Sequence, residues 1–184
     1  MVGKEISRKE IEEKINKMGD YAQMGYLSAC LKNQLDFDTR KFVLVKLAGL
    51  YENRMMFLDA GKMMKSAADI NTTYQNKIND FVKSAEFFIK GGDYENADSS
   101  IKRALALGNE KQKQEIKNKE KEVYKMQAKM FMKKDKRTNS VEVYEKLLEL
   151  ELGAVEKTEV KNSLLNLYEK LGRIREYYSL KKGI

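Results

Sequence analysis

Pairs of residues twelve positions apart recur along this chain, each pair joining two segments whose apolar residues have the spacing of helices. The pairs are Ala48 with Ala60, Ala85 with Ala97, Ala128 with Ser140, and Leu165 with Tyr177. Small residues allow two helix axes to approach closely, and large apolar residues beside the crossing fill the space around it. The recurrence therefore predicts a chain built from helical hairpins, with an all-α fold.

Apolar residues surround each pair in a shared register. Around Ala85 and Ala97 they are Phe81, Phe88 and Ile101, which fall on one stripe of each helix at intervals of three and four residues. The second members of the four pairs follow one another at intervals of 37, 43 and 37 residues. Because one hairpin cannot bury such a stripe alone, we expect the copies to stack on their neighbours.

The copy that contains Ser84, Ala85, Phe88 and the sequence GDYENA at 92–97 closely resembles a tetratricopeptide repeat, a helical hairpin with a period of about 34 residues. The resemblance implies a right-handed α-solenoid that forms a single domain over residues 1–184. About five antiparallel hairpins are expected, over approximately 4–35, 39–71, 73–108, 110–152 and 154–184. The long helices and the absence of a closing proline also resemble the hairpins of the soluble NSF attachment proteins.

The charge of the chain indicates a mixed surface with a modest positive excess. It has 36 basic and 28 acidic side chains, a formal net charge of +8. Surfaces that bind nucleic acids usually concentrate basic residues and interleave them with exposed aromatic residues. Here the aromatic residues occupy the predicted core stripe, so a basic helical repeat that binds nucleic acid is the alternative function and not the first.

No catalytic, metal or cofactor site is predicted. The sequence has no histidine, the commonest general base and zinc ligand. Gly61-Lys62 lacks the upstream glycine and the following Ser or Thr of a phosphate-binding loop. We therefore expect a binding module that does no chemistry of its own.

The resemblance implies a ligand groove lined by the first helix of each hairpin, and helical phase selects the side chains that project into it. The fourth hairpin makes the groove most basic. The predicted groove residues are Lys125, Lys129, Met132, Lys133, Glu86, Lys90, Asn162 and Asn166. The expected partner is a protein or peptide segment with acidic side chains or a free carboxylate.

The chain is expected to be cytoplasmic. No apolar run approaches the length of about 18 residues that crosses a bilayer, and the single Cys30 has no partner for a disulfide within the chain. The terminal hairpins, with Tyr177, Tyr178 and Leu180 near the C-terminal end, are expected either to cap the array or to support self-association.

Overall fold

Ten α-helices make up the computed structural model, which describes residues 7–183, and no strand occurs within these residues. The all-α prediction is confirmed. The helices are α1 (Arg8–Ile15), α2 (Asp20–Cys30), α3 (Phe37–Asn53), α4 (Phe57–Ile70), α5 (Tyr74–Gly91), α6 (Tyr94–Leu107), α7 (Glu110–Lys133), α8 (Arg137–Leu148), α9 (Ala154–Lys170) and α10 (Ile174–Lys182). Residues 4–6 and 184, which belong to the first and last predicted hairpins, lie outside the described residues.

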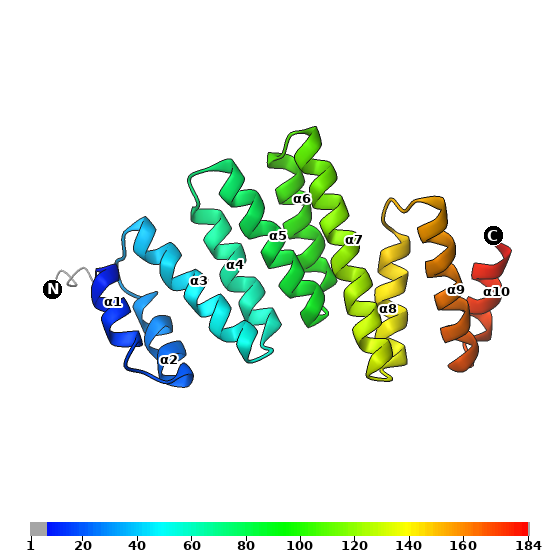
Figure 1. The fold of residues 1–184 in the computed structure, drawn as a ribbon, viewed down its shortest axis with the longest axis horizontal. Helices are drawn as coiled ribbons and strands as arrows, with labels where there is room; N and C mark the ends of the chain where they lie inside the picture. The colour runs from blue at the N-terminus through cyan, green and yellow to red at the C-terminus, as the bar shows by residue number, and fades with distance from the viewer. Residues whose placement is uncertain (1–6, 184) are drawn as a thin grey trace. The chain divides into compact units, whose positions relative to one another are not determined.

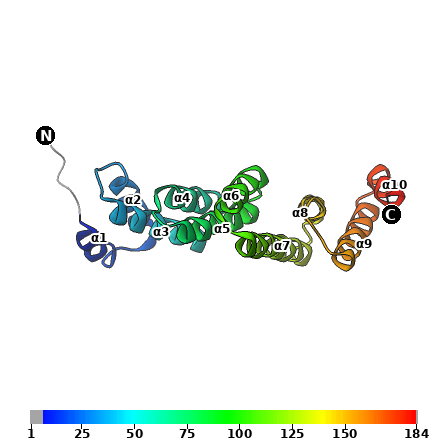
Figure 2. The ribbon, with the colours of Figure 1, turned by 90° about the horizontal axis from the view of Figure 1, so that it is seen from above.

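The chain divides into two compact units, Met1–Ile116 (unit 1) and Lys117–Ile184 (unit 2), with the boundary inside α7. In unit 1, α3 packs against α4, α4 against α5, and α5 against α6 (Figure 1). Seen from above, α2, α4 and α6 form one layer of unit 1, and α1, α3 and α5 form the other (Figure 2). In unit 2, α9 packs against both α8 and α10. The organisation of the chain as one domain stays a prediction.

Small residues lie where consecutive helices approach each other. Ala60, Ala85 and Ala97 are fully buried in unit 1, as are Ala128 and Ser140 in unit 2. The fourth pair behaves differently, because Leu165 and Tyr177 are only half-buried. Its first helix instead buries the preceding residue, Leu164.

Four hairpins share one turn geometry, in which a residue with a positive φ ends the first helix. These residues are Met55 (φ 56°), Gly92 (81°), Asp135 (51°) and Gly172 (68°), and they follow one another at intervals of 37, 43 and 37 residues. In each turn the next residue donates its backbone N–H to the carbonyl of an aromatic residue five positions earlier, at 2.8 to 2.9 Å. The acceptors are Tyr51, Phe88, Phe131 and Tyr168. This is the Schellman turn, which satisfies carbonyls at a helix end. The four turns follow one another along the sequence at the same intervals as the four residue pairs.

Candidate functional site

Two adjoining cavities lie in unit 2 between residues of α7, α8 and α9, and we call them together the unit 2 groove. The first, about 240 Å³, is lined by Lys125, Lys129, Tyr144, Leu147, Glu159, Val160 and Ser163. The second, about 410 Å³, is lined by Met132, Tyr144, Asn162, Ser163, Asn166 and Lys170. Tyr144 and Ser163 line both cavities, so the two are continuous along the helices.

Lys125 is already paired with a carboxylate from the start of α9. Its Nζ lies 2.5 Å from Oε1 of Glu156, and Lys121 Nζ lies 3.6 Å from Oε2 of the same carboxylate. Glu156 also accepts the backbone N–H of Gly153 at 3.0 Å, which caps α9. These contacts, the hydrogen bond from Lys125 foremost, lower the pKa of Glu156 to about 2. Glu156 is therefore ionised at neutral pH, and two lysines share its single charge.

Lys129 and Lys133 lie on the same side of α7 as Lys125 but form no ion pair with any carboxylate that the structure describes. Lysines stand at every fourth position of this part of α7, at 117, 121, 125, 129 and 133. Glu151 pairs with Lys117 at 3.0 Å, and Glu156 serves the next two lysines. Within residues 7–183, no carboxylate forms an ion pair with Lys129 or Lys133. Like charges four residues apart on a helix repel each other, and no carboxylate of the described residues offsets the repulsion between these two ammonium groups.

The remaining groove residues supply neutral polar and apolar contacts. Asn162 and Asn166 are exposed on α9 and lie one helical turn apart, beside Met132 in the second cavity. An asparagine amide has both donors and an acceptor, the groups needed to bind a peptide backbone. Leu147 and Val160 provide apolar walls in the first cavity, where Glu159 adds a negative charge.

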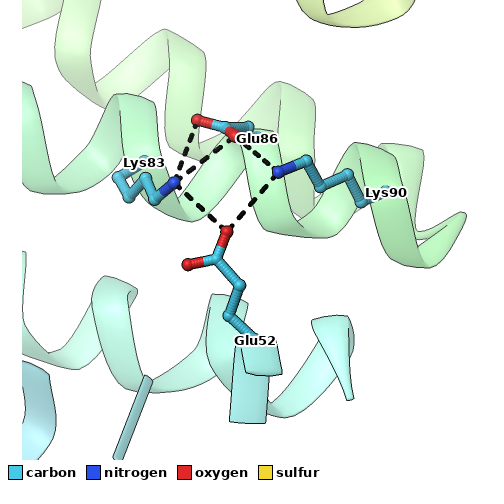
Figure 3. Close-up of polar contacts among 4 residues, drawn as sticks. All are labelled: Glu52, Lys83, Glu86 and Lys90. Carbon is cyan, nitrogen blue, oxygen red and sulfur yellow. Dashed lines mark hydrogen bonds and ion pairs between the residues drawn. The ribbon is translucent and has the colours of Figure 1, made fainter. Parts of the chain in front are cut away.

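Glu86 and Lys90 lie in unit 1, where an ion network holds them (Figure 3). Lys90 Nζ lies 2.6 Å from Glu86 Oε1, and Lys83 Nζ lies 3.3 Å from Glu86 Oε2. Both ammonium groups also reach Glu52 Oε1 on α3, at 3.6 and 3.5 Å. Burial would raise the pKa of Glu86, but hydrogen bonding and charge from Lys90 and Lys83 outweigh it and lower that pKa. The network joins α3 to α5, and its charges balance one another.

The eight predicted groove residues are thus divided between the units. Lys125, Lys129, Met132, Asn162 and Asn166 line the unit 2 groove, whereas Lys133 lies outside both cavities. Tyr144 and Ser163, at the junction of the cavities, were absent from the prediction. Tyr144 is half-buried.

Residues 7–183 contain no group of three His, Cys, Asp or Glu side chains that could hold a metal ion. None of the described helices is both long and apolar enough to cross a membrane.

Among solved structures, several chains are similar to this one. No protein-family model matches the chain, and no curated protein matches its sequence. A solved structure, described as the crystal structure of BtubC (BKLC) from P. vanneervenii, is similar with a TM-score of 0.40 and 13% sequence identity. The match covers 93% of this chain and 74% of that one. A likeness of this strength carries no conclusion about function.

Proposed function

We propose that this chain is a non-catalytic protein-interaction module, a tetratricopeptide-like solenoid whose unit 2 groove binds an acidic segment of a partner protein. One observation carries the proposal: Lys129 and Lys133 have no carboxylate partner among the described residues, although the three preceding lysines of the series at every fourth position of α7 do. Lys129 also lines the groove. A peptide carboxylate beside these residues would supply the missing counter-charge.

The other groove residues fit an extended peptide. Asn162 and Asn166 can hydrogen-bond its backbone, and Leu147 and Val160 can contact an apolar side chain next to the acidic one. The preferred ligand therefore alternates acidic and apolar residues. Glu159 and Glu156 disfavour a run of consecutive carboxylates near Lys125.

The test is fluorescence anisotropy with a fluorescein-labelled peptide of alternating glutamate and leucine. The variant Lys129→Glu/Lys133→Glu replaces two attractions by two repulsions. At roughly 0.5 kcal/mol for each exposed charge interaction, binding should weaken by about 2 kcal/mol, or about thirtyfold.

The matched control is Lys119→Glu/Lys136→Glu, which changes the net charge equally. Both of its lysines are exposed, line neither cavity, and do not belong to the series of lysines at every fourth position of α7. Binding by the control should stay within about threefold of the wild type, because screening reduces the effect of distant charges. Equal weakening of the two variants would show that net charge alone attracts the peptide, and would overturn the proposal.

Nucleic-acid binding is the second candidate, favoured by the lysines at every fourth position of α7. A single-stranded oligonucleotide distinguishes it. Affinity for the oligonucleotide should fall steeply with salt, because each neutralised phosphate releases a counterion. If the oligonucleotide binds more tightly than the peptide and its affinity depends on Lys129 and Lys133, the second candidate replaces the first.

A further inference from the structure

The turn between α3 and α4, residues 55–58, is apolar where the equivalent turns are polar. It reads Met-Met-Phe-Leu, whereas the other three turns of the same geometry read Gly-Asp-Tyr-Glu (92–95), Asp-Lys-Arg-Thr (135–138) and Gly-Arg-Ile-Arg (172–175). The three turns serve as internal references for what the hairpin itself requires. The hairpin therefore does not need four consecutive apolar residues in its turn.

These apolar side chains are exposed around a cavity. Met55 is 73% exposed, Met56 42% and Leu58 40%. With Phe57, Asp59, Lys90 and Gly91 they line a cavity of about 370 Å³. Gly91 helps to shape its wall, since a Cβ there would lie 2.6 Å from Cδ2 of Leu58.

The backbone of Met55 gives a second and independent indication. Its φ of 56° is left-handed, a conformation that costs little for glycine and is tolerated by aspartate, but is unfavourable for methionine. Gly92, Asp135 and Gly172 occupy the equivalent positions. Hairpin stability alone would therefore favour glycine at position 55, while methionine adds an exposed, flexible thioether of the kind found on adaptable binding surfaces.

We propose that Met55, Met56 and Leu58 form a docking surface that receives one large, uncharged apolar side chain from a segment of a partner protein. The charges at the cavity are already satisfied, because Asp59 pairs with Lys62 at 3.5 Å and Lys90 pairs with Glu86. An acidic group would gain nothing there. This surface belongs to unit 1, so the proposal is independent of the unit 2 groove.

The size of the surface selects a partner segment over a second copy of the chain. A stable dimer buries about 800 Å² on each partner, far more than three side chains can provide. The cavity volume is near the lower end of small-molecule pockets, which begin at about 300 Å³. It suits a single anchoring side chain.

N-acetyl-leucinamide is a suitable probe, with N-acetyl-serinamide as its polar control. In protein labelled with ¹³C at the methionine methyl groups, the leucine probe should shift the Met55 and Met56 signals saturably, in the millimolar range expected for so small a ligand. The serine probe should leave both signals in place. A ligand-observed saturation-transfer signal should appear for the leucine probe alone.

The matched variant Met55→Gly/Met56→Asp/Leu58→Glu copies residues 92, 93 and 95 of the next hairpin. It should lose the saturation-transfer signal for N-acetyl-leucinamide, while its thermal midpoint stays at or above that of the wild type because the left-handed position becomes glycine. A thermal midpoint at or above that of the wild type separates loss of the surface from loss of the fold.

Three results would overturn the proposal. The first is the absence of saturable methyl shifts with the leucine probe, and the second is a signal that persists in the variant. The third is a dependence of the Met55 and Met56 shifts on protein concentration without any probe, which would assign the surface to a second copy of the chain.

Discussion

Gly61 in α4 and Gly49 in α3 provide a matched pair for testing the close approach of the helices in unit 1. A Cβ on Gly61 would lie 2.9 Å from Cδ1 and Cε1 of Phe88, whereas a Cβ on Gly49 would have no neighbour within 4 Å. Phe88 is 1% exposed, so its ring has little room to move aside. Replacing glycine by alanine should therefore have opposite effects on stability at the two sites.

The magnitudes follow from two opposing effects. Replacing glycine by alanine inside a helix stabilises it by about 1 kcal/mol, and this gain applies to both positions. At Gly61 the added methyl group overpacks the core, which costs about 1 to 3 kcal/mol. We expect Gly49→Ala to stabilise unit 1 by about 1 kcal/mol and Gly61→Ala to destabilise it by about 1 kcal/mol.

Urea unfolding followed by circular dichroism measures the difference between the two variants. Both glycines lie in unit 1, so the comparison is made within one unfolding transition even if the two units unfold separately. If Gly61→Ala proves as stabilising as Gly49→Ala, Phe88 does not pack against α4 as described, and the reasoning about small residues at this helix crossing fails.

Three other outcomes are expected. Glu156→Gln should tighten binding of the glutamate-leucine peptide severalfold, because it frees Lys125 for the ligand while glutamine can still accept the Gly153 N–H; unchanged anisotropy titrations would contradict this. Glu86→Gln should lower the stability of the protein at neutral pH, and the difference in stability from the wild type should shrink as the pH falls below about 4.3. The reason is that a carboxyl group whose pKa is lowered in the folded state stabilises the fold above its unfolded pKa and loses that contribution in acid. A difference in urea midpoints that does not depend on pH would refute this prediction. Ser140→Ala should stabilise the protein by about 1 kcal/mol, because the buried Oγ of Ser140 has no hydrogen-bond partner among the described residues. Ser84→Ala should destabilise it by about 1 kcal/mol, because Ser84 Oγ donates to the Gly61 carbonyl at 2.9 Å. Equal effects of the two substitutions in thermal unfolding would contradict this difference in hydrogen bonding.

The helices could be predicted because their signals are local and repeated. Ala85, Ala97 and the glycine-containing turn between them place a hairpin by short-range spacing alone. The left-handed backbone at Met55 and Asp135 could not be predicted, since neither residue type requires it. Their conformation is the one found at Gly92 and Gly172 in the equivalent turns.

The groove was predictable to the extent that helical phase determines it. Phase alone placed Lys129 and Asn166 on a shared groove, and their role in binding stays a prediction. The pairing of Glu156 with Lys125 depends on contacts between helices distant in sequence, as do the contacts of Glu52 with Lys83 and Lys90. Such contacts determine which charged side chains remain available to a ligand. The residue pattern of a single helix does not reveal these contacts.

The most direct test of the unit 2 groove is to map amide chemical shifts while the glutamate-leucine peptide is titrated into the labelled chain. The account predicts saturable changes centred on Tyr144 and Ser163, the two residues shared by both cavities. A peptide with glutamine in place of glutamate should produce much weaker changes. Shifts that centre elsewhere, or that are equal for the two peptides, would contradict the account.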